Sequence, residues 1–208
     1  MDLTTLAGDV MVEAPNCPTF LAEAKLREAA AEFCRRTRQW RGPLDAIITI
    51  ANLAENEYDL APPSGARVVS LLRCTVDGQN AGLYEEVGLD ARNPTWREST
   101  GPTVQGVVAL STLKVAMYPK VTAGGQTIVV TAALTPTDDT VSDEIGDRYR
   151  DAFIYGALYR LLNMRVQPWY DPGEAEKKRR FFEREISDAK NEVGFTDNDL
   201  SVKMRRVW

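Results

Sequence analysis

The chain has 208 residues, with 25 Lys and Arg, 30 Asp and Glu, and a formal net charge of −5. This length is sufficient for one substantial core, but the acidic balance argues against a protein that grips nucleic acid, which normally carries a basic face. The chain contains no histidine, which excludes Ser-His-Asp and Cys-His catalysis and removes the commonest zinc ligand.

Two helices are expected at the start of the chain. Apolar residues at helical spacing predict a short helix that ends before Pro15, and Pro18 begins a longer helix that runs to about Gln39. Basic residues gather at the end of the longer helix: Arg35, Arg36, Arg38 and Arg41. They either contact a phosphate or an acidic partner, or they complement the negative end of the helix dipole in solvent.

From Gly42-Pro43 onward the apolar period changes to two, which is typical of strands. Strands are expected over residues 46–51, 57–60, 68–76, 83–87, 113–117 and 127–134. Asp77-Gly78 predicts a hairpin turn, and the last two strands are expected to form a hairpin with each other. Between 93 and 102 lies a turn-rich piece that contains Trp96.

The stretch from Asp143 to Arg165 is predicted to be the central helix, about six turns long, around which the rest of the chain packs. The buried stripe of this helix is expected to include Tyr149, Phe153, Gly156, Ala157 and Leu161. Charged residues interrupt the stretch, and it is too short to span a membrane. Gly156-Ala157 forms a notch where another chain segment can approach closely.

Two groups of possible metal ligands occur, and neither predicts a metal site. Acidic residues precede the central helix: Asp138, Asp139, Asp143 and Glu144. They either bind a cation or stabilise the start of the helix, but they lack the calcium-loop pattern. The cysteines are Cys17, Cys34 and Cys74. They lack metal-binding spacing and are expected to be reduced thiols.

A third long helix begins at Asp171-Pro172, a capping residue followed by a proline at the first helical position, and Gly194 can end it. Its first half carries a basic run: Lys177, Lys178, Arg179 and Arg180. The run either meets an acidic partner or forms a solvated helix face. Residues 195–208 are predicted to be a flexible C-terminal tail because they contain few apolar residues.

These elements predict an α+β fold: mainly an α-helical bundle, with a β-rich insertion between the second and third long helices. Residues 1–194 are expected to form a single domain. Its helical frame comprises residues 1–41 and 140–194, and the insertion comprises residues 44–136.

Several short motifs occur in an order that is similar to a known family. They are Ala-x-Glu-Phe-Cys-x-x-Thr (Ala30 to Thr37), Trp-Arg-x-x-x-Gly-Pro (Trp96 to Pro102), Tyr-Pro (Tyr118-Pro119), Ala-Leu-x-Pro (Ala133 to Pro136), Tyr-Arg-Asp-Ala (Tyr149 to Ala152), Gly-Ala-Leu-x-x-Leu-Leu (Gly156 to Leu162) and Pro-Trp (Pro168-Trp169). Together they resemble the head-to-tail adaptor, or connector, proteins of tailed phages, most like those of short-tailed phages. The resemblance covers residues 19–193.

The resemblance implies a structural virion protein of the neck, assembled in the host cytoplasm. It implies that about twelve copies form a ring beneath the portal ring of a filled head. It also implies that this ring extends the DNA channel and offers an attachment surface for the tail nozzle or tube. The implied partners are therefore the portal protein, the tail nozzle or tube protein and further copies of the chain, with passive contact to packaged DNA and no membrane.

The resemblance carries over no catalytic residue, and no cofactor or metal is expected. We infer that the end of the tail binds the portal: Met204, Arg205, Arg206, Val207 and Trp208. Four further residues are expected to contact another subunit or partner: Trp96, Arg97, Lys177 and Arg180. A buried position within its own chain is an equal alternative for Trp96. Two other functions stay open: a peptidoglycan glycosidase with paired carboxylates, and a non-viral helical adaptor that binds a partner.

Overall fold

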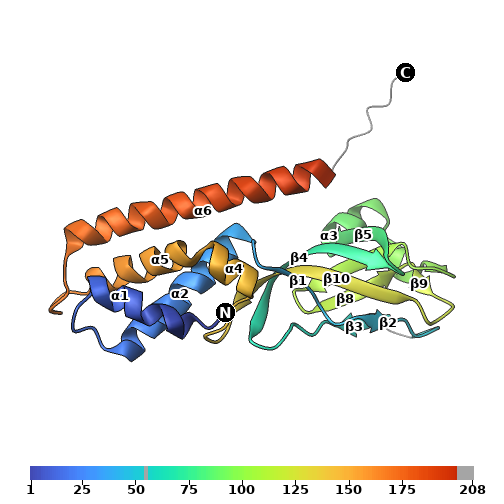
Figure 1. The fold of residues 1–208 in the computed structure, drawn as a ribbon. Helices are drawn as coiled ribbons and strands as arrows, with labels where there is room; N and C mark the ends of the chain where they lie inside the picture. The colour runs from blue at the N-terminus through green and yellow to red at the C-terminus, as the bar shows by residue number, and fades with distance from the viewer. Residues whose placement is uncertain (54–55, 201–208) are drawn as a thin grey trace, which may run out of the picture. The chain divides into compact units, whose positions relative to one another are not determined.

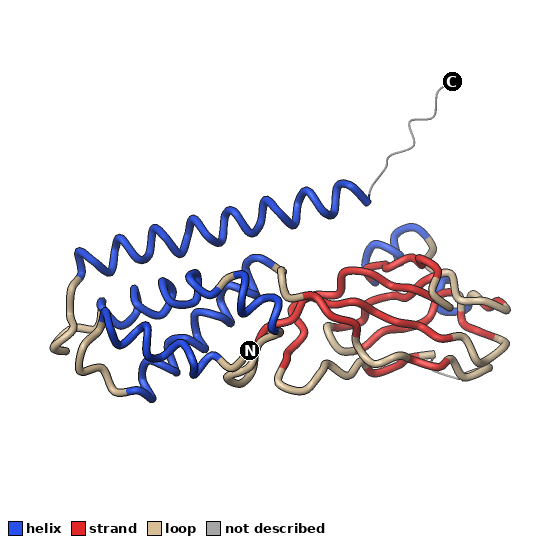
Figure 2. Tube along the Cα trace, viewed as in Figure 1, coloured by secondary structure: helices blue, strands red, loops and turns tan. Residues whose placement is uncertain are grey.

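The computed structural model of the protein describes residues 1–53 and 56–200 (Figures 1 and 2). The chain divides into two compact units. The helical unit contains Met1–Trp40 and the chain from Thr135 onward, and the β unit contains Arg41–Leu134.

The helical unit is formed by segments from the two ends of the described chain. Its elements are η1 (Leu3–Leu6), α1 (Ala7–Glu13), α2 (Thr19–Thr37), α4 (Asp143–Arg148), α5 (Arg150–Leu162) and α6 (Pro172–Leu200). The two helices expected before residue 42 are confirmed. Asp171 caps α6 as predicted, since its Oδ1 accepts a hydrogen bond from the backbone N–H of Glu174 at 2.9 Å. Gly194 does not end this helix, which continues to Leu200.

The predicted single helix from Asp143 to Arg165 is wrong, because the segment forms two helices, α4 and α5. Tyr149 separates them with φ −114° and ψ 24°, outside the helical region. Its ring packs 4.7 Å from the ring of Phe33, and its hydroxyl donates to Glu192 at 2.8 Å. The buried stripe continues through both helices, so hydrophobic periodicity could not reveal the break.

The β unit is built around one sheet. The strands are β1 (Arg41–Pro43), β2 (Ile47–Ile48), β3 (Glu57–Asp59), β4 (Ala66–Val76), β5 (Gln79–Glu85), β6 (Thr100–Gly101), β7 (Gly106–Ser111), β8 (Lys114–Tyr118), β9 (Lys120–Val121) and β10 (Thr127–Pro136). Eight of the described strands form a mixed sheet in the order β1-β10-β4-β5-β7-β8-β3, with β2 beside β10. The β5–β7 pair is parallel, whereas β6 and β9 form a separate small sheet.

This sheet overturns the predicted fold class. Beside its helices the described structure has a large curled mixed sheet, so the protein is not mainly a helical bundle. The long strands β4 and β10 form central parts of this sheet. The apolar alternation revealed separate strands, but the pairing that joins them into one sheet depends on contacts between distant segments.

Turn chemistry correctly predicted one hairpin. Asp77 and Gly78 have φ values of 48° and 79°, as a two-residue hairpin turn requires, and they join β4 to β5. The predicted hairpin between 113–117 and 127–134 is wrong, because β8 pairs with β7 and β3 instead of β10. Strand β7 and the short helix α3 (Glu86–Arg92) were not predicted.

Each unit has its own buried side chains. The helical core joins α2, α5 and α6, and its largest fully buried members include Phe33, Phe153 and Phe182. In the β unit, Val107, Val108, Val115, Met117, Ile128 and Val130 are buried. A smaller cluster lies where α3 covers β7 and β8: Leu89, Trp96, Val108 and Ala116.

Candidate partner-binding surfaces

The structure places the five expected stripe residues of the central segment in the helical core: Tyr149, Phe153, Gly156, Ala157 and Leu161. Gly156 lies at a close approach of helices. A Cβ atom at this position would lie 2.7 Å from the Cβ of Ala29 and 2.9 Å from Cε2 of Phe182. The notch is therefore filled by α2 and α6 of the same chain.

Trp96 is 3% exposed and lies in the small cluster of the β unit, beside Leu89 and Val108. It begins a short 3₁₀ helix, η2 (Trp96–Glu98). Its indole N–H donates to Oδ1 of Asp90 at 2.7 Å, which satisfies the polar atom of this buried side chain. Of the two alternatives for Trp96, the structure matches a buried position in its own chain.

Arg97 covers Trp96 and fixes it to α3. Its guanidinium lies 4.5 Å from the Trp96 ring centroid and forms ion pairs with Glu86 and Asp90, each at 2.6 Å. Arg97, and then Trp96, lower the pKa of Asp90 by hydrogen bonding to its carboxylate. The side chain of Arg97 remains half exposed, so it still offers a cationic surface beside α3.

The basic run on α6 divides into two kinds of residue. Lys177 and Arg180 are exposed and pair within the helix, with Glu174 at 2.8 Å and Glu176 at 3.2 Å. Hydrogen bonds from Arg179 and then Arg180 lower the pKa of Glu176 to about 2. Lys178 is buried instead, where it pairs with Glu13 and lies 5.4 Å from the ring centroid of Tyr155.

The basic cluster at the end of α2 contributes to packing between helices. Arg36 bridges α2 and α6, since it pairs with Glu32 at 2.9 Å and with Glu183 at 2.6 Å. Arg160 of α5 also pairs with Glu32, and it stacks 4.5 Å from the ring centroid of Tyr159. Glu32 of α2 therefore joins Arg160 of α5 to Arg36, and Arg36 in turn reaches α6.

The acidic residues before the central segment bind groups of the protein itself. Asp139 pairs with Arg27 at 2.5 Å, and Asp138 accepts a hydrogen bond from the Thr140 hydroxyl at 2.6 Å. Asp143 pairs with the terminal amino group. In the described part of the chain, no group of three His, Cys, Asp or Glu residues is arranged to hold a metal ion.

The pKa shifts of the carboxyl groups can be compared with the glycosidase alternative, because a glycosidase needs a catalytic acid with a raised pKa. Within residues 1–53 and 56–192, every carboxyl group with a clear pKa shift has its pKa lowered. Hydrogen bonds stabilise the charged form of each. Their environment therefore favours carboxylate over a proton-donating acid.

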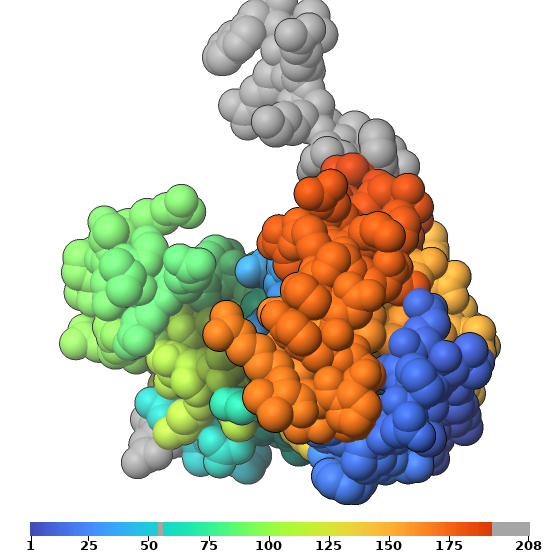
Figure 3. Space-filling view, turned by 90° about the vertical axis from the view of Figure 1, so that its left-hand side faces the viewer, coloured from blue at the N-terminus to red at the C-terminus, as the bar shows by residue number. Residues whose placement is uncertain are grey.

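One end of the helical unit exposes large apolar side chains, which sequence reasoning did not identify. We call this set the loop end: Val12 at the last turn of α1, Phe20 at the first turn of α2, and Val166 and Tyr170 in the α5–α6 connection. The α1–α2 and α5–α6 connections lie together at the left of Figure 2. Figure 3 views that end of the unit, with blue and orange atoms side by side. Periodicity could not separate these residues from core residues.

Val166 is the most exposed residue of the loop end, at 96%. Its φ of 69° lies in the left-handed region, which is rare for a β-branched residue. No described part of the chain buries this apolar side chain. Strained residues of this kind are concentrated at binding sites and switch regions.

The expected portal-binding residues Met204, Arg205, Arg206, Val207 and Trp208 lie outside the described residues. Among the described residues, no helix combines the length and apolar character that crossing a lipid bilayer requires.

Exposed apolar side chains such as those of the loop end are typical of surfaces that contact other proteins. The family described as SU10 adaptor protein matches residues 1–205. The chain belongs to this family and is a phage adaptor, a structural component of the virion that binds other virion proteins. The resemblance to phage adaptors is thereby confirmed, whereas no curated protein matches the chain.

Proposed function

We propose that the protein is the head-to-tail adaptor of the virion neck. About twelve copies form a ring beneath the portal, extend the DNA channel and offer the attachment surface for the tail nozzle or tube. Many linked contacts let a modest affinity between two subunits give a stable ring. The net charge of −5 suits a channel wall past which DNA slides, because many Lys or Arg contacts would hold the phosphates.

The loop end is the observation that carries this proposal. Val12 and Phe20, on either side of the α1–α2 connection, are 80% and 72% exposed, and Val166 in the α5–α6 connection is 96% exposed. Apolar side chains that gather on a surface mark sites of protein contact. A contact in the assembled neck would remove them from water and would offset the strain at Val166.

The sequence of the tail suggests the contact with the portal. Residues 204–208 combine two arginines with Met204, Val207 and Trp208. Burial of one Trp removes about 150–250 Å² from water, whereas fixing each tail residue costs roughly 1–2 kcal/mol of backbone entropy. The tail therefore docks where the portal offers a groove, and its arginines favour an acidic rim.

The test mixes the purified chain with portal rings from the same phage and follows assembly by light scattering and electron microscopy. We expect a monomer alone and a closed ring on the portal. Deletion of residues 202–208 should abolish portal binding and leave the melting temperature unchanged. Phe20→Lys should weaken ring closure, and Val87→Lys, on an 81% exposed position of α3, is the matched control.

Two results would contradict the proposal. A closed ring without the portal would remove the portal as the template for assembly. The chain without residues 202–208 could also still bind the portal but melt at a lower temperature. That result would mean that the tail packs on the helices of its own chain.

A further inference from the structure

Strands β4 and β5 separate soon after the turn that joins them. They pair only at three positions, from Val76 with Gln79 to Cys74 with Ala81. From Gly82 onward, β5 pairs with β7 on its other side. Among the described strands, none pairs with the Ala66–Arg73 part of β4 on the side that faces β5.

The backbone groups of both strands face this opening. The N–H of Asp77 donates to Thr127 of β10 at 2.7 Å, and the N–H of Gly82 donates to Gln105 at 2.9 Å. Backbone groups of successive strand residues alternate between the two edges. Ser70 and Leu72 of β4 therefore direct their N–H and C=O groups toward β5, and alternate residues of β5 direct theirs toward β4.

A groove of about 330 Å³ lies at this opening. It is lined by Val69, Ser70, Leu71, Leu83, Tyr84, Glu85, Ala109, Ser111 and Thr112. Successive side chains of one strand normally point to opposite faces of a sheet. Three consecutive residues of each strand line the groove, together with Ala109 and Ser111 of β7, so the groove adjoins the opening between β4 and β5.

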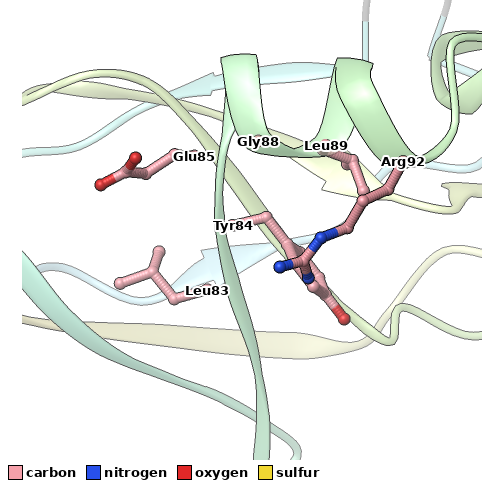
Figure 4. A pocket seen from close by; sticks show the side chains of 6 residues that line it. All are labelled: Leu83, Tyr84, Glu85, Gly88, Leu89 and Arg92. Carbon is pink, nitrogen blue, oxygen red and sulfur yellow. The ribbon is translucent and has the colours of Figure 1, made fainter.

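The exposure of β4 agrees with this geometry. Residues 69–72 are all half-buried, whereas buried and more exposed residues alternate in the two ends of the strand. The hydroxyl oxygen of Ser70 is buried and has no hydrogen-bond partner among the described groups. Figure 4 shows Leu83 and Glu85 on one side of β5, with Tyr84 on the other side toward Arg92.

We propose that this groove binds an extended segment of another virion protein, which adds as a strand between β4 and β5. Such a segment would satisfy the backbone groups of both strands and place apolar side chains against Val69, Leu71 and Leu83. It would also bring a backbone group to the Ser70 hydroxyl. The groove lies within the β unit, and this inference goes beyond the proposed ring and portal contact.

The topology excludes the described strands of a second copy as the inserted strand. A strand that enters the groove must be free on both edges, because β4 and β5 each offer it one edge. Every described strand of this chain already pairs with at least one other strand. The donor is therefore a segment that belongs to no sheet of its own.

The first experiment uses phage particles that carry the full chain with a benzophenone amino acid in place of Leu71. Illumination should join position 71 to one segment of another virion protein, which mass spectrometry locates. The same amino acid at Val87, an exposed position of α3, is the control and should not reach that segment. A crosslink to a second copy, or none at all, would overturn the proposal.

The second experiment measures binding of the located segment, as a labelled synthetic peptide, to the purified full chain. Leu72→Pro removes an N–H that faces the groove, and Leu72→Ala is the matched control that keeps it. We expect binding at least about tenfold weaker for the proline variant and changed by less than about twofold for the alanine variant.

Thermal melting shows whether the proline variant is folded. If it is not, Val69→Lys replaces it, because a charge in the groove should exclude the apolar peptide. The proposal would be overturned if the peptide bound the proline or lysine variant as tightly as it binds the unaltered protein. Portal binding does not enter this measurement, so its outcome is separate from that of the proposed function.

Discussion

Gly156 of α5 lies at a close approach to α2 and α6. The neighbouring atoms that a Cβ would meet belong to Ala29 and Phe182, and both residues are fully buried. Neither neighbour can move into solvent, because the core around them is close-packed. At this position, the absence of a side chain sets the distance between helices.

Gly156→Ala should therefore lower the free energy of unfolding by about 1–3 kcal/mol. Gly8→Ala is the matched control in α1, where nothing lies within 4 Å of the added Cβ. Since alanine restricts the unfolded chain, the control should stabilise the protein by about 0.4–1 kcal/mol. Urea unfolding of both variants measures the difference, and equal stability of the two would show that the notch is not tightly packed.

At the scale of elements, a partly buried charge network holds the helices of the helical unit. The Arg160 side chain is 14% exposed and stacks on Tyr159, 5.7 Å from the ring centroid of Phe182. Its partner Glu32 also binds Arg36, which reaches Glu183 on α6. The network fixes the relative rotation of three helices whose apolar contacts are less directional.

Arg160→Ala should destabilise the protein by about 1–3 kcal/mol, because it leaves Glu32 with one cation fewer and removes the stacking on Tyr159. Arg180→Ala is the control on α6, with a side chain that is 77% exposed, and it should change stability by less than about 0.5 kcal/mol. Thermal and urea unfolding provide both values. If Arg160→Ala were as mild as the control, apolar packing alone would hold the three helices.

At the scale of the whole molecule, the charges balance locally while the chain remains acidic overall. Many exposed cations pair with a carboxylate of the same unit, as Arg97 does with Asp90 and Lys177 with Glu174. Such pairs contribute little to stability. They do reduce the cationic surface that DNA phosphates could contact.

The purified protein should therefore not bind duplex DNA measurably at about 0.15 M salt. An electrophoretic mobility shift assay with a labelled duplex tests this expectation. Repeating the assay at about 0.05 M salt gives the salt dependence, which reports the number of phosphate contacts. Micromolar binding with a steep salt dependence would contradict a channel wall past which DNA slides.

The sequence by itself determined the features that depend on neighbouring residues. Asp171 and Pro172 begin α6 as their capping chemistry requires, and Asp77-Gly78 forms the hairpin turn that its positive φ values favour. The motif order also identified the phage adaptor family correctly. Capping and turn preferences act over a few residues, so one chain segment is enough to reveal them.

Only the tertiary structure decided which distant segments meet. It paired β8 with β7 and β3, buried Trp96 against α3, and exposed Val166 in a left-handed conformation. It also separated β4 from β5 beyond Cys74. An apolar residue has the same local pattern whether it is buried or exposed, because the hydrophobic effect has no direction and depends on the area that other segments cover.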